Sequence, residues 1–290
     1  MVASALLAVA PSAASAAEPL VLEPANAWML DYAAESCTLQ RTFRGGGSDL
    51  IMQIVSNGDP YATRIVLAGT ALVRTPKPVD TVTARLTLDT EPRQDILALN
   101  GKAGDANAVA FLLDLGPAFD GAAYSKLSPA EQDLQDKARL PLRPDFERAT
   151  TNIVVQRAKG PALDIRTGRM SAPLTALRTC VRDLRGSWGL DLAVEDTLSR
   201  QVLIRPATVQ AFQGSFPTAM NIAGFNAYVP VRVTVDATGT AEACVVQLDL
   251  PEPFKVAVCD TLEKKFDAAL DANGQPVRSI YNVSVVYVLQ

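Results

Sequence analysis

The last quarter of the chain carries the pattern that most constrains its fold. Residues 229–235 alternate valine with proline, arginine and threonine, which is the period-2 pattern of a strand with one buried face. Asp236 and Gly239 then bound a turn, because Asp bonds its own backbone and Gly accepts a positive φ. A second strand, a helix and a Val- and Tyr-rich strand over 277–289 follow. The sequence therefore predicts a β-hairpin, a helix and a strand over residues 214–290.

The helix is expected from apolar residues that fall on one face. Cys259, Leu262 and Phe266 stand at i, i+3 and i+7, and the charged residues 263–265 fall on the faces between them. Asn273-Gly274 ends the helix or turns the chain beyond it. We therefore expect the helix to cover one face of the hairpin.

Three motifs of this region resemble the C-terminal domain of TonB-family energy transducers. They are Phe216-Pro217 with Ala219, the VPVRVTVDATG strand and turn, and the DANGQPV approach to the last strand. The resemblance covers about the last quarter of the chain, and it implies the fold described above. In that family the domain binds extended segments of outer-membrane transporters by strand pairing at a sheet edge. The membrane helix and long proline-rich spacer of TonB proper have no counterpart here, so we expect a binding role rather than energy transduction.

The resemblance makes the last strand the candidate edge for an extended peptide from an envelope protein. The side chains expected to set specificity are those of Arg278, Ile280, Asn282, Ser284 and Val286. Two alternatives stay open: the strand is covered within the protein, or a second copy pairs with it to form a homodimer.

Residues 1–17 form an apolar segment that ends in small residues, which is typical of a secretory signal peptide. We expect this peptide to be cleaved and the protein to be periplasmic. The basic start of such a peptide is missing, since the first Lys or Arg is Arg41, so a disordered Ala-rich tail is the alternative. No apolar run reaches the length of a membrane span, and none is expected.

Four cysteines are an even number in a chain expected to be exported, and three connectivities are possible. Cys244 belongs to the inward face of a strand and Cys259 to the helix face that covers it, so we expect these two to pair. Cys37 and Cys180 would then staple the two ends of the first domain. Four free thiols are an alternative. A metal site is disfavoured because the chain has no CxxC motif and no histidine.

Residues 18–190 are expected to form a β-rich domain with one long helix, which makes the protein α+β. Turn residues separate short strand candidates in a way that predicts an antiparallel sandwich or a strongly curved sheet. The helix over 171–188 has a buried stripe, and Ser128 with Glu131 predicts a capping box on a shorter helix. Residues 191–213 are expected to be a linker. The strand candidates are 37–43, 51–55, 64–68, 82–88, 96–99, 109–115, 153–156 and 162–166.

The sequence contains no recognisable set of catalytic residues. The absence of histidine excludes a Ser-His-Asp triad and imidazole metal ligands, and no S-x-x-K motif is present. Glycines 45–47 lack the Lys-Ser/Thr of a Walker loop and fit a hairpin turn. A net charge of −4 without a basic run argues against a nucleic-acid partner. We therefore expect neither an enzyme nor a bound cofactor or metal.

Carboxylate pairs are a further kind of candidate catalytic site, because glycosidases need only Asp and Glu. The acidic residues at 131, 133 and 136 fall on an exposed helix, and those at 249, 252 and 260 flank the start of the C-terminal helix. With only 6% aromatic residues, neither set has the aromatic cleft expected for sugar binding. The favoured function is a periplasmic protein-binding module that takes part in transport across the envelope. The alternatives are a first domain that binds a small ligand or has an activity of its own, and a purely structural envelope role.

Overall fold

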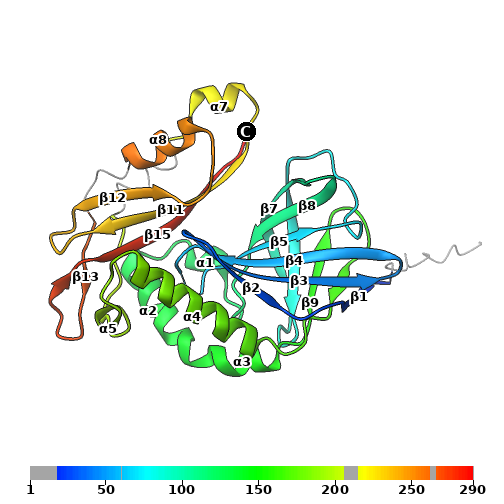
Figure 1. Cartoon of the computed structure of the whole chain (residues 1–290), viewed down its shortest axis with the longest axis horizontal. Coiled ribbons are helices and arrows are strands. Elements are labelled where there is room, and N and C mark those ends of the chain that lie inside the picture. Colours follow the sequence, from blue (N-terminus) through cyan, green and yellow to red (C-terminus); the bar gives the residue numbers. More distant parts are fainter. Residues whose placement is uncertain (1–17, 60, 206–214, 262–265, 290) are drawn as a thin grey trace, which may run out of the picture.

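The computed structural model describes residues 18–59, 61–205, 215–261 and 266–289. The predicted signal peptide, residues 1–17, lies outside the described residues. The chain folds into a β-rich N-terminal unit and a small C-terminal unit of three main strands and short helices (Figure 1). The α+β class expected from the sequence is confirmed.

The N-terminal unit is a closed nine-stranded β-barrel, so the expectation of a sandwich is wrong. The first strand explains the closure, because it pairs with both ends of the sheet. Residues 20–22 pair in parallel with β10, and Glu23 and Pro24 pair with Arg44 and Phe43 of β3. A tenth strand, β2 (Met29–Tyr32), extends from β3 outside the closed ring. The barrel strands are β1 (Leu20–Pro24), β10 (Leu163–Ile165), β9 (Ile153–Arg157), β6 (Val79–Leu86), β7 (Arg93–Ala103), β8 (Ala106–Leu112), β5 (Arg64–Ala68), β4 (Ser48–Ser56) and β3 (Cys37–Gly45), in spatial order.

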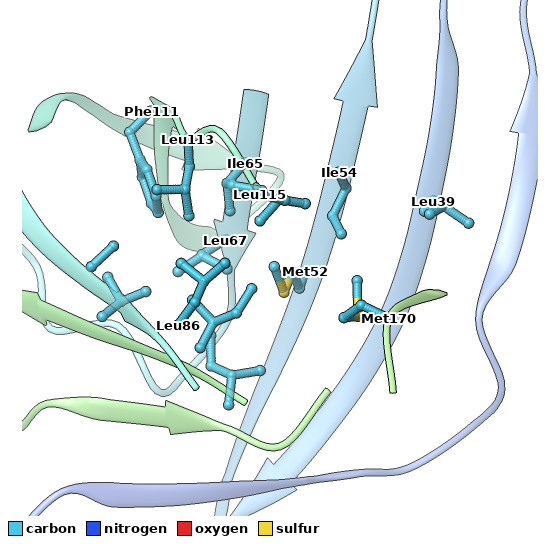
Figure 2. Close-up of a cluster of buried hydrophobic side chains, with 14 of the residues drawn as sticks. Leu39, Met52, Ile54, Ile65, Leu67, Leu86, Phe111, Leu113, Leu115 and Met170 are labelled. Carbon is cyan, nitrogen blue, oxygen red and sulfur yellow. The ribbon is translucent and has the colours of Figure 1, made fainter. Parts of the chain in front are cut away.

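The interior of the barrel is filled by side chains. Alternate residues of each strand point inward, and a barrel of about eight strands is just wide enough for side chains to fill it. Figure 2 shows this packing, with Met52 and Leu67 close to the centre and Met170 entering from the segment before α4 (Ser171–Ser187). The other labelled members of the cluster are Leu39, Ile54, Ile65, Leu86, Phe111, Leu113 and Leu115.

Four helices and one 3-10 turn gather at one side of the barrel (Figure 1). The longest helix buries the predicted stripe of Leu174, Leu177, Val181 and Leu184 against the barrel core. The capping box of Ser128 with Glu131 at the start of α2 is confirmed. These elements are α1 (Gly121–Tyr124), α2 (Pro129–Arg139), η1 (Leu140–Leu142), α3 (Arg143–Ala149) and α4 (Ser171–Ser187).

The C-terminal unit has the expected hairpin, helix and strand. Its sheet has the order β12-β11-β15, and buried residues of α8 pack in the same apolar core as the valines of β11. The helix begins at Glu252 and buries Phe254 and Val258, so the expected stripe is wrong: Phe266 lies after the helix, and Leu262 lies outside the described residues. The elements are α7 (Thr218–Ile222), β11 (Ala227–Val235), β12 (Ala241–Val246), α8 (Glu252–Thr261), β13 (Ala269–Leu270), β14 (Pro276–Val277) and β15 (Ser279–Tyr287).

The expected linker comprises residues 191–213. Its described part, residues 191–205, is folded onto the two units. Its helix α5 (Leu192–Glu195) is tied to α4 by the ion pair of Arg185 with Glu195. Further along, Val202 and Ile204 are buried in the C-terminal core. Residues 198–204 therefore belong to the C-terminal unit, and residues 206–213 lie outside the described residues.

Two disulfides cross-link the fold in the expected pairing. Cys37 of β3 is bonded to Cys180 of α4, and Cys244 of β12 is bonded to Cys259 of α8. Such bonds persist in oxidising compartments, which favours an exported protein. Among the described residues, no helix combines the length and apolarity that crossing a bilayer requires.

Candidate functional site

The C-terminal sheet is covered on both faces at β11. The valines of β11 face α8, and the polar face, which the sequence predicts to be in water, packs against the barrel. Arg232 on that face is only 8% exposed. Its guanidinium forms an ion pair with Glu35 at 3.0 Å and lies 4.2 Å from the ring centre of Trp188. Gln247 adds a hydrogen bond to the carbonyl oxygen of Asn57 at 3.0 Å.

The register of β15 divides its side chains between the same two faces. Tyr281, Val283 and Val285 lie opposite buried valines of β11 and share the face under α8. The even-numbered residues of β15 lie opposite Thr234, Arg232, Pro230 and Tyr228, so they share the face that is directed at the barrel. The side chains of β15 therefore face α8 or the barrel. Only the backbone of β15 is exposed along the outer edge of the sheet.

The predicted specificity residues are thus mostly engaged within the protein. Ile280 is only 5% exposed, and the hydroxyl groups of Ser284 and Tyr228 are hydrogen-bonded at 2.5 Å. Arg278, which precedes β15, forms an ion pair with Glu242 at 2.7 Å. The Oδ1 atom of Asn282 is buried and has no hydrogen-bond partner among the residues that the structure describes. The fifth residue, Val286, lines a cleft described below.

The backbone edge of β15 is different, because no other strand occupies it in the described part of the chain. β15 pairs with β11 along all nine of its residues without a register shift. Its sequence, SIYNVSVVY, contains no charge and no proline. The opposite edge strand, β12, has six residues, and its pairing with β11 shifts register between Thr234 and Val235. Proteins protect sheet edges with short strands, bulges, charges and prolines, and β15 has none of these devices.

No protein-family model, curated protein or solved structure matches this chain. The similarity of residues 214–290 to TonB C-terminal domains therefore remains an expectation drawn from motifs.

An apolar cleft lies beside the C-terminal end of β15. Its volume is about 270 Å³, and it is lined by the outer face of the barrel on one side and by Tyr228 and Val286 on the other. Leu97 of β7 and Leu112 of β8 are 42% and 41% exposed on the barrel side. Sequence analysis missed this cleft, because it arises only when two units distant in sequence come together.

One charged side chain, Arg64 of β5, enters the cleft. Its guanidinium lies 4.7 Å from the ring centre of Tyr228. Burial lowers the pKa of Arg64 and raises the pKa of Tyr228. Burial also raises the pKa of Tyr281, on the other face of the sheet, to about 12. These tyrosines are therefore neutral at physiological pH and act here as ring and hydroxyl groups.

Five of the six carboxylates singled out in the sequence make contacts with nearby side chains or backbone groups. Glu131 completes the capping box, Asp133 forms an ion pair with Lys137 at 2.8 Å, and Asp136 accepts a hydrogen bond from Tyr124 at 2.7 Å. Near the C-terminal helix, Lys255 lies 3.8 Å from Asp249 and 3.7 Å from Glu252. Within the described ranges, no three Cys, Asp or Glu side chains are grouped in a way that could hold a metal ion.

Proposed function

We propose that this protein is an envelope binding module that adds an extended peptide segment to the free edge of β15. The observation that carries the proposal is a nine-residue edge without charge, proline or register shift. Such an edge offers unpaired N–H and C=O groups at the spacing of an incoming strand. The partner would be an extended segment of an outer-membrane transporter or of another envelope protein. The TonB-like motifs support this choice, and the two disulfides support a periplasmic location.

Because both faces of the sheet are covered, they limit how the protein would recognise the sequence of such a partner. Because the side chains of β15 point to α8 or to the barrel, an added strand gains its affinity mainly from main-chain hydrogen bonds. Sequence preference would then come from the partner's own side chains where they meet the barrel beside β15. On this proposal the protein binds and positions its partner and carries out no chemistry of its own.

Backbone-modified peptides provide the test. A heptapeptide that binds the whole chain is selected from a random display library. Two copies are then made, with N-methyl groups on either the odd-numbered or the even-numbered backbone amides (the two phases). We expect one of the two possible N-methyl phases to abolish binding and the other to retain it, because only alternate amides of an edge-paired strand point to the sheet. Equal binding of both phases would reject strand addition. If β15 instead pairs with a second copy of the chain, the protein will self-associate and the peptide will not displace that second copy.

A pair of proline variants locates the edge on the protein. Asn282→Pro removes an outward-pointing backbone donor from β15, and Val246→Pro makes the matched change at the outer edge of β12. We expect only Asn282→Pro to abolish peptide binding. Circular dichroism and intact disulfides report whether each variant folds, and unchanged binding in a folded Asn282→Pro protein contradicts the proposal.

A further inference from the structure

The cleft between the two units has the composition of a ligand site. On the barrel side its wall is made by Leu97, Leu99 and Leu112, and on the sheet side by Tyr228 and Val286. Contiguous exposed apolar patches on soluble proteins often mark ligand-binding grooves or interaction sites. Its volume of about 270 Å³ is close to the lower end of the range for small-molecule sites, so it fits one short apolar chain.

Arg64 gives this apolar cleft a single positive charge. On β5, Arg64 lies directly opposite Leu112 of β8, so the cation and the apolar wall are cross-strand neighbours. The Nε atom is buried without a hydrogen-bond partner, and among the described residues the guanidinium makes no ion pair. The guanidinium stays charged at neutral pH even though burial lowers its pKa.

The surroundings of Arg64 do not neutralise it. The ring of Tyr228 attracts the cation through its π face but supplies no anion. Asp59 influences the pKa of Tyr228, but among the described residues it forms no ion pair with Arg64, and its Oδ1 atom accepts hydrogen bonds from the backbone of Tyr61 and Ala62. A partly buried cation without an anionic partner has lost part of its hydration, and an anion that brings an apolar tail would offset that cost while filling the cleft.

We propose that the cleft binds an anionic amphiphile, a short-chain to medium-chain carboxylate whose headgroup pairs with the Arg64 guanidinium. Its tail lies between Leu97 and Leu112 on one side and Val286 on the other. The Tyr228 hydroxyl, already bonded to Ser284, lies beside the headgroup as a second polar group. The barrel wall and two residues of the C-terminal sheet, Tyr228 and Val286, form this site, and ligand binding there does not require strand pairing at β15.

The test uses the whole chain with decanoate as the probe and 1-decanol as a neutral molecule with the same tail. Isothermal titration should show that decanoate binds at least about tenfold more tightly than decanol, since a charge-assisted pair forms only with decanoate. Arg64→Met keeps an apolar stem and removes the charge, so it should remove this preference. Leu112→Gln should weaken the binding of both probes.

The controls separate this site from nonspecific effects. Arg85→Met removes an exposed arginine from β6 and should leave both affinities unchanged. Equal affinity of the unmodified protein for decanoate and decanol would overturn the proposal, and that result does not depend on any variant folding. Unchanged decanoate binding in folded Arg64→Met or in folded Leu112→Gln would also overturn it.

Discussion

Arg232 of the C-terminal sheet and Glu35 of the segment between β2 and β3 form an ion pair that joins the two units. The guanidinium stacks on Trp188, which caps α4, so one side chain contacts the barrel unit twice. This contact holds the sheet with its polar face against the barrel. The same arrangement leaves the backbone of β15 as its free edge and creates the cleft at Arg64.

Removing Glu35 should therefore destabilise the protein. Glu35→Ala leaves Arg232 buried without its anion, and we expect a loss of about 1–3 kcal/mol in the free energy of unfolding. Urea denaturation measures it. The control is Asp49→Ala, which breaks the pair of Arg44 with Asp49, whose side chains are 70% and 60% exposed. That change should cost at most about 0.5 kcal/mol, and equal losses would contradict a joining role for Glu35.

Gly58 should not tolerate a side chain. Its φ is +102°, and a Cβ atom there would lie 2.6 Å from the Trp188 ring. We expect Gly58→Ala to cost about 2–4 kcal/mol, from backbone strain and displacement of the ring, and to shift the tryptophan fluorescence. Gly104→Ala is the matched variant, because Gly104 has a φ of +58° and no atom within 4 Å of its added Cβ. A similar cost for both would show that the Trp188 contact is unimportant.

The two disulfides should contribute unequally to stability. Cys244 and Cys259 are separated by 15 positions, whereas Cys37 and Cys180 are separated by 143. Loop entropy predicts about 3 kcal/mol for the shorter loop and about 5 kcal/mol for the longer one. We expect the double alanine variant of Cys37 and Cys180 to melt at the lower temperature. The reverse order would indicate that local packing, rather than chain entropy, decides their contribution.

The turn between β11 and β12 should weaken in acid. The Asp236 carboxylate accepts hydrogen bonds from the backbone of Thr240 and from the side chain and backbone of Thr238, and these bonds lower its pKa below the usual 3.8. A folded pKa below the unfolded value means that the stabilisation is present above the unfolded pKa and is lost as the pH falls through the folded pKa. The melting temperatures of wild type and Asp236→Asn should therefore converge as the pH falls below 3.8. A constant difference would show that Asp236 does not titrate in this way.

Local patterns predicted individual elements well. Flanking turn residues marked out a strand over 64–68, which are the observed bounds of β5, and the glycine at 239 occupies a positive φ of 82° as expected. The disulfide pairs followed from the faces on which Cys244 and Cys259 were expected. These features depend on residues near one another in sequence, where periodicity and turn chemistry carry the information.

Long-range arrangement was not predictable in the same way. Nothing local shows that β1 pairs with both β10 and β3, which turns a curved sheet into a barrel. Likewise, Arg232 and Ile280 are ordinary outward strand residues until the barrel covers them. The cleft at Arg64 was not predicted for the same reason, because β5 and β11 are far apart in the chain.

Amide hydrogen exchange across β15 tests the central claim most directly. With the selected heptapeptide bound, we expect slower exchange at alternate amides of Ser279–Tyr287, the ones that point away from β11. The amides of β12, at the opposite edge of the same sheet, should be unchanged. Protection at β12, or no protection in β15 when the peptide is bound, would contradict strand addition at this edge.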